Sequence, residues 1–247
     1  MKKAVLCFVS LILIFYGNAV YADEAYYTNL NGLKFTEYQY NTLVEMLNEH
    51  IVETLTYEEY QNFNVDSIVE GEYFYNIVED DTSSNLNSRS FHETTCKKIV
   101  LSGSCSSTKC AMALTTNWKC IPAVKSYDVM GVRLASTTFY DDARTFTFRY
   151  NGNTTTSYAG LRGASNGVGY AFKIPSSGNV DYAALVFNVK PQGRVYGTYQ
   201  HAVENISLNT ALDFTFNSSG YGGVFAWPSS YGQIYDQMAG VYLGLPV

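Results

Sequence analysis

CKKIVLSGSCSSTKCAMALTTNWKC, residues 96–120, decides the fold of this chain, because it holds four of the five cysteines at spacings C-x8-C-x4-C-x9-C. Zinc sites with four cysteine ligands usually bring them in two close pairs, and here only Cys105 and Cys110 approach that spacing. The segment also lacks the C-x-x-C pair of redox proteins. The spacing therefore predicts two disulfides rather than a metal site or a reactive centre.

Strand alternation indicates how the four cysteines pair. From Cys110 to Cys120 every second residue lies on one strand face, so that face carries both cysteines. The residues before Cys105 form the partner strand, which makes a β-hairpin. Of the three possible pairings, we favour the nested one, Cys105 with Cys110 and Cys96 with Cys120. Cys96 then lies opposite Lys119, so the outer bridge needs a bulge or a loosened strand end.

The rest of the chain beyond the hairpin is rich in short segments that alternate in polarity. Tyr and Phe number 36 and charged residues are only 15% of the chain, a composition that suits strands. Strands are predicted at 126–134, 145–150, 168–174, 183–189, 194–202, 211–216 and 222–227. Turns are predicted at Asn151-Gly152, 176–179 and 218–220. The pattern predicts a mainly β fold, an antiparallel β-sandwich or jelly roll, and disfavours a parallel α/β fold.

The N-terminus, residues 1–22, has the pattern of a secretory signal peptide. Lys2 and Lys3 precede an apolar run of 13 residues, and small residues lead to Ala22. That run is shorter than the roughly 20 residues that span a bilayer. We expect a mature chain that starts near Asp23, is secreted to the extracellular space and has no membrane span. Disulfides persist in that compartment.

Residues 23–79 are predicted to form a small acidic helical module. Thr36 with Gln39, and Thr56 with Glu59, have the spacing of capping boxes, and the first helix continues to Ile51. Residues 80–94 are polar and are predicted to be a linker, followed by a disulfide-stapled β-sandwich domain at 95–247.

Charge divides the chain into two unlike parts. Residues 23–95 hold 15 acidic and two basic residues, whereas the chain from Cys96 onward holds seven acidic and 12 basic residues. The two parts either dock electrostatically or are solvated independently.

Two stretches, TNWKCIPAVKSYDVMGVRL at 116–134 and YYTNLNGLKFTEYQY at 26–40, resemble a group of uncharacterised secreted proteins of Gram-positive bacteria. The resemblance implies export from a Firmicute-type host. It implies no reaction and no site residue.

One motif suggests catalysis. Residues 163–167, GASNG, match the G-x-S-x-G of α/β-hydrolases, so Ser165 and His201 are candidate catalytic residues, with Asp181 or Asp213 as an orienting carboxylate. The motif lies between two predicted strands, however, where a turn explains it without catalysis. A secreted serine hydrolase is therefore kept as an alternative.

No cofactor or metal is predicted. The three histidines are scattered, and Asp141-Asp142 is interpreted as a solvated turn. Nucleic-acid binding is not predicted either, because the basic residues are dispersed.

Recognition is the function class that the composition favours. Trp227, Tyr231 and Tyr235 lie on or beside one loop and are candidate ligand-binding residues, whereas Trp118 shares a strand face with core residues. We expect a secreted non-enzymatic binding or adhesion protein whose partner is an extracellular glycan or protein. The Gly- and Ser-rich stretch 151–171 keeps a β-pore-forming or membrane-damaging protein as a second alternative.

Overall fold

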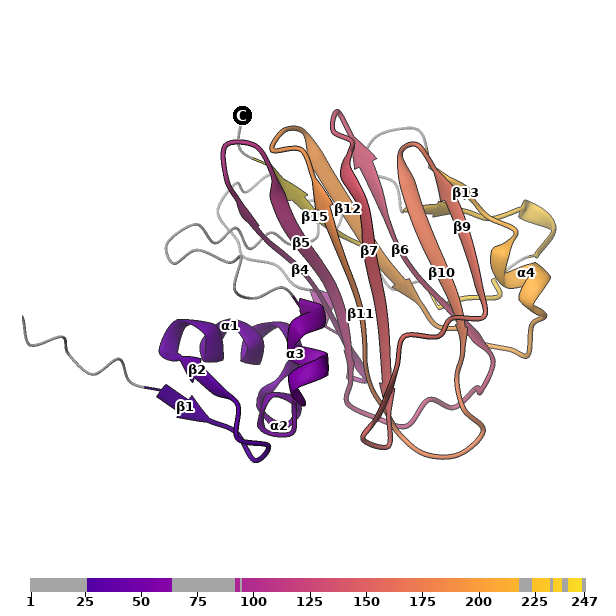
Figure 1. Ribbon diagram of the computed structural model, residues 1–247. Coiled ribbons are helices and arrows are strands. Elements are labelled where there is room, and N and C mark those ends of the chain that lie inside the picture. The colour runs from indigo at the N-terminus through magenta and orange to yellow at the C-terminus, as the bar shows by residue number, and fades with distance from the viewer. Residues whose placement is uncertain are drawn as a thin grey trace, which may run out of the picture.

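Two antiparallel sheets pack face to face at the centre of the molecule (Figure 1). The computed structural model describes residues 26–63, 92–93, 95–217, 224–231, 233–236 and 240–245. The six-stranded sheet has the order β3 (His92–Glu93), β4 (Lys97–Cys105), β5 (Cys110–Trp118), β11 (Val180–Val189), β7 (Phe139–Tyr150) and β8 (Asn153–Thr155). The five-stranded sheet has the order β15 (Val241–Gly244), β12 (Arg194–Gln200), β6 (Tyr127–Ala135), β10 (Gly167–Lys173) and β9 (Gly160–Ala164). The mainly β, antiparallel fold predicted from the sequence is thus confirmed.

The β4–β5 hairpin belongs to the six-stranded sheet. Its register runs without a break from Cys105 opposite Cys110 to Lys97 opposite Trp118. The structure joins Cys105 to Cys110 and Cys96 to Cys120, which is the nested pairing expected from the sequence. The outer bridge lies just beyond the last strand pair, where the backbone N–H of Lys119 donates a hydrogen bond to the carbonyl of Cys96 at 2.7 Å, and the register of the hairpin contains no bulge.

Apolar side chains of both sheets fill the space between them. Met112 and Leu114 of β5 meet residues of the other sheet such as Val132 and Leu243, and all four are almost completely buried. Ala113 lies on the opposite face of β5, as the period of a strand requires, and belongs to a different cluster. The inward face predicted for residues 110–120 is therefore confirmed.

Helices cover the outer face of the six-stranded sheet (Figure 1). These are α1 (Glu37–Leu47), α2 (Glu49–Glu53) and α3 (Tyr57–Phe63), with a hairpin of β1 (Tyr26–Thr28) and β2 (Lys34–Thr36) beside them. The capping box of Thr36 and Gln39 is confirmed. The expected continuation of the first helix to Ile51 is wrong, because Asn48 has φ 103° and its side chain caps α2 instead.

The outer face of the five-stranded sheet is covered by C-terminal segments, namely α4 (Leu208–Leu212), β13 (Thr215–Phe216), β14 (Phe225–Ala226) and the 3-10 turn η2 (Ser229–Tyr231). The strand predicted at 211–216 is wrong in its first half. The Ser207 side chain accepts a hydrogen bond from the backbone N–H of Thr210, and this cap starts a helical turn where the alternation alone indicated a strand.

The predicted turns are confirmed only in part, and the predicted linker contains a short strand. The turn at Asn151-Gly152 is confirmed, and both residues have positive φ, 48° and 72°. Asp141 and Asp142 lie inside β7 rather than in a turn, so that interpretation is wrong. His92–Glu93, near the end of the predicted linker, pairs with β4. The signal peptide, residues 64–91 of the acidic module and the linker, and the turn 218–220 lie outside the described residues.

Candidate functional site

A cavity of about 270 Å³ lies where α3 meets the β8 edge of the six-stranded sheet. Thr56, Glu58 and Glu59 line it from the helical side, and 154–156, three threonines, line it from β8 and the residue that follows. Every lining side chain ends in a hydroxyl or a carboxyl group. This cavity is the candidate functional site.

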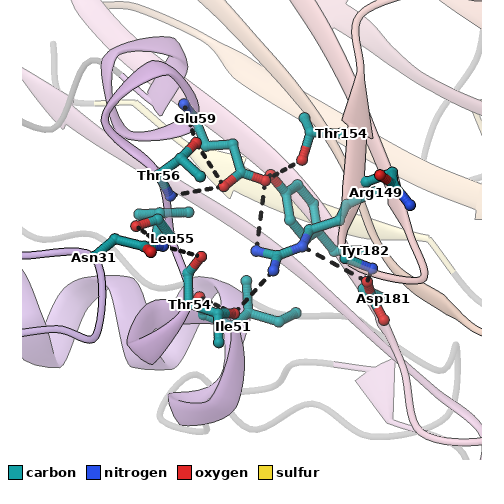
Figure 2. A network of polar contacts seen from close by, with 12 residues as sticks. Asn31, Ile51, Thr54, Leu55, Thr56, Glu59, Arg149, Thr154, Asp181 and Tyr182 are labelled. Atoms are coloured by element: carbon teal, nitrogen blue, oxygen red, sulfur yellow. Dashed lines mark hydrogen bonds and ion pairs between the residues drawn. The ribbon is translucent and has the colours of Figure 1, made fainter.

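Glu59 anchors the cavity wall. One carboxylate oxygen, Oε2, accepts hydrogen bonds from the backbone N–H of Thr56 at 2.8 Å and from its hydroxyl at 2.9 Å, which confirms the predicted second capping box. The other oxygen, Oε1, accepts from the hydroxyl of Thr154 and, at 3.4 Å, from that of Tyr182 (Figure 2). Helix capping thus leaves Oε1 facing the sheet.

Arg149 of β7 supplies the positive charge of this network. Its Nη1 lies 3.5 Å from Glu59 Oε1, and its Nε lies 3.6 Å from Asp181 Oδ2 (Figure 2). Its Nη2 donates a hydrogen bond to the hydroxyl of Thr54 at 2.9 Å. The side chains of Arg149 and Glu59 are 8% and 3% exposed, so this ion pair is buried between the helices and the sheet.

The surroundings keep Tyr182 protonated. Burial is the main cause that raises the pKa of the Tyr182 hydroxyl, and the negative charge of Glu59 raises it further. A protonated hydroxyl can donate to Glu59 at any physiological pH. Arg149 offsets the charge of Glu59, while the exposed Glu58 adds a negative charge at the cavity. The site can therefore accept and donate hydrogen bonds.

The aromatic residues predicted to bind a ligand lie elsewhere, over the five-stranded sheet. Trp227 donates a hydrogen bond from Nε1 to Gln200 at 2.8 Å, and its ring centre lies 4.6 Å from that of Tyr235, which is buried. The hydroxyl of Tyr231 donates to Asp213. The structure thus brings Trp227 and Tyr235 together as packing residues of one cluster, with Tyr231 beside them.

The hydrolase alternative is not supported by the placement of its residues. Ser165 lies in the turn between β9 and β10, which is tied to Leu134 through the carbonyl of Asn166. His201 follows β12, whose last residue pairs with Val129. Since Leu134 and Val129 are five residues apart on β6, the two sites are separated by about 17 Å at 3.3 Å per residue.

The orienting carboxylates proposed for His201 are also wrong. Asp181 lies beside Arg149, and Asp213 accepts from Tyr231, whereas Nδ1 of His201 contacts Asp128. The G-x-S-x-G match is a β-turn, as the alternative interpretation expected. In the part of the chain that the structure describes, no group of three or more His, Cys, Asp or Glu side chains could hold a metal ion.

Residues 151–171, considered as a pore-forming hairpin, are divided between the two sheets. β8 pairs with β7 in one sheet, while β9 and β10 pair in the other. Among the described helices, none has the length and apolar character needed to cross a bilayer.

Arg149 and Thr154 were not identified from the sequence as site residues, and Asp181 was considered only as an orienting carboxylate of the hydrolase alternative. The available signals were the capping position of Glu59 and the charge difference between the two parts of the chain. The Glu59–Arg149 pair joins those two parts, in agreement with electrostatic docking.

Comparison with known proteins assigns no family. No family model matches the chain, and no curated protein matches it. Among solved structures, the pilus backbone protein RrgB of Streptococcus pneumoniae is similar over 38% of this chain and 25% of its own, with 12% identity and a TM-score of 0.28. A likeness this low supports no argument about fold or function.

Proposed function

We propose that this chain is an extracellular, non-enzymatic binding protein, and that the cavity between α3 and β8 holds a hydroxyl-rich ligand such as one sugar unit of a glycan. One observation carries the proposal: all six lining side chains end in a hydroxyl or a carboxyl group. Such groups can pair with several ligand hydroxyls, each of which both donates and accepts.

Size and surroundings support a small polar ligand. The cavity of about 270 Å³ is below the range of roughly 300–1,000 Å³ typical of clefts for drug-sized molecules. Tyr57, next to the lining residue Thr56, is 66% exposed and offers an aromatic face at the start of α3. An aromatic face with a polar tip is a common contact for a partly apolar ligand.

Secretion is part of the proposal. The signal-like residues 1–22 and the two disulfides are consistent with an oxidising extracellular compartment. If the bound glycan belongs to a cell surface or to another protein, binding it would attach this chain to that surface or protein. The surface around Trp227 and Tyr231 stays a second predicted contact region.

A glycan array probed with the mature protein tests the proposal. We expect retention of a defined glycan set, at least tenfold weaker for Glu58→Gln and for Thr156→Val. Both side chains are exposed at the cavity, so the substitutions leave the core unchanged.

Matched controls are Glu204→Gln and Thr138→Val, which make the same chemical changes at exposed positions that do not line the cavity. Both should bind like the wild type. Folded protein that retains no glycan, or that loses binding equally in the controls, would refute this assignment.

A further inference from the structure

A second polar cluster is buried at the opposite end of β4 from the inner disulfide. Lys97, the first residue of β4, forms an ion pair through Nζ with Oδ2 of Asp236, and its side chain is 4% exposed. The rings of Trp118 and Tyr199 lie beside the ammonium, each with its centre 5.3 Å from Nζ. The ammonium of Lys97 is therefore held against two aromatic rings, while the side chain of Asp236 is 28% exposed.

The two oxygens of the Asp236 carboxylate have different partners. Oδ1 accepts a hydrogen bond from the backbone N–H of His201 at 2.9 Å, while Oδ2 faces Lys97. A backbone N–H aimed at one carboxyl oxygen is the arrangement that stabilises negative charge on that oxygen during attack at the carboxyl carbon. Oδ1 is thus the oxygen that would remain, and Oδ2 the one that would leave.

Asp128 holds this arrangement in place. Its fully buried carboxylate accepts from the hydroxyl of Tyr199, from the backbone N–H of Ala202 at 3.1 Å, and contacts Nδ1 of His201 at 2.9 Å. These contacts fix the backbone at His201 and hence its N–H. Asp128 is accordingly a positioning residue.

We propose that Lys97 and Asp236 condense into an intramolecular amide. The Nζ–Cγ bond forms, and the Cγ–Oδ2 bond breaks. Two of the three ammonium protons leave with Oδ2 as water, and the third stays on the amide nitrogen. No oxidant, cofactor or other reactant is needed, and the product is neutral.

The surroundings favour this step because the two groups are already in contact, which removes the entropy cost of bringing them together. The cross-link would join residues 139 positions apart in the sequence and would lie next to the Cys96–Cys120 bridge.

Intact-mass measurement of the reduced, alkylated protein tests the proposal. We expect a mass one water below that calculated from the observed N-terminus, and a branched proteolytic peptide that contains both Lys97 and Asp236. Lys97→Arg and Asp236→Ala should each restore the full mass. Lys98→Arg, a neighbouring change of the same kind, should leave the cross-link intact.

The wild-type mass decides the question even if a variant fails to fold. A folded wild-type protein at full mass, with Lys97 cleavable by trypsin after unfolding, would overturn the proposal. Asp128→Asn tests the positioning role, and we expect cross-link formation to slow at least tenfold while the disulfides still form. Unchanged kinetics in that variant would remove Asp128 from the reaction.

Discussion

Glu59 illustrates how one side chain takes part in two levels of structure. Through Oε2 it caps the start of α3, and through Oε1 it meets Arg149 and Thr154 of the sheet. Taking two charges out of water is costly, and their attraction and hydrogen bonds offset that cost only while both are present. Removing one partner of the ion pair should therefore destabilise the fold more than removing both partners together.

Replacing Arg149 with methionine should strongly destabilise the fold. The substitution keeps an apolar stem but leaves Glu59 charged, buried and without its cation, a change that costs about 3–5 kcal/mol in buried pairs. Urea unfolding should show the lower midpoint.

The double variant Glu59→Gln/Arg149→Met serves as one comparison, and we expect it to recover most of the loss because no buried charge remains. Asp142→Ala serves as another. Asp142 pairs with Arg144 at the surface, so its removal should change the free energy of unfolding by no more than about 1 kcal/mol. Equal losses for the buried and the surface variant would contradict the role given to Glu59.

Two strands of the five-stranded sheet contain glycines where the C-terminal segments pack. Gly131 of β6 lies opposite Gly169 of β10, and the rings of Phe214 and Phe225 cover this pair. A Cβ at Gly131 would lie 2.4 Å from the carbonyl oxygen of Val168 and 2.6 Å from the ring of Phe225. The aromatic rings therefore rest directly on the backbone of these two strands.

Gly131→Ala should therefore destabilise the protein by about 1–3 kcal/mol, the usual cost of overpacking, because backbone atoms cannot move aside cheaply. Thermal unfolding followed by circular dichroism measures the effect. Gly163→Ala on β9 is the matched control, since nothing lies within 4 Å of its added Cβ. A control as destabilised as Gly131→Ala would show that glycine flexibility, not ring packing, decides the outcome.

Across the whole molecule, the layers are linked by buried contacts. Leu43, Met46 and Leu47 of α1 pack with Ala113 and Tyr182 of the six-stranded sheet in one cluster. Side chains of β5 also donate hydrogen bonds to the carbonyl of Met46. The N-terminal helices are joined to the six-stranded sheet by this apolar cluster and by the buried Glu59–Arg149 ion pair. We therefore expect the helices to unfold together with the sheets.

Leu47→Ala tests this coupling. The side chain is completely buried, so its truncation should cost about 2–5 kcal/mol. We expect helix content, followed by far-ultraviolet circular dichroism, and the fluorescence of Trp118 and Trp227 to shift to the same lower midpoint. If only the helical signal shifted, the two parts would be independent units.

The sequence by itself determined those features whose energies are local. Alternation along residues 110–120 predicted the inward face of β5 and the nested pairing of the cysteines. Spacing of three residues predicted both capping boxes, and Asn151-Gly152 predicted a tight turn. Each of these features depends on residues a few positions apart or within one hairpin. The sequence pattern therefore predicts them without knowledge of the tertiary structure.

Only the tertiary structure decided which distant side chains meet. Glu59 and Arg149 are 90 positions apart, and Lys97 and Asp236 are 139 apart. Which partner a polar residue finds depends on how sheets and helices stack their faces, and many stackings satisfy the same apolar periodicity. Burial then selects the pairs, because a charge removed from water is tolerated only beside a partner.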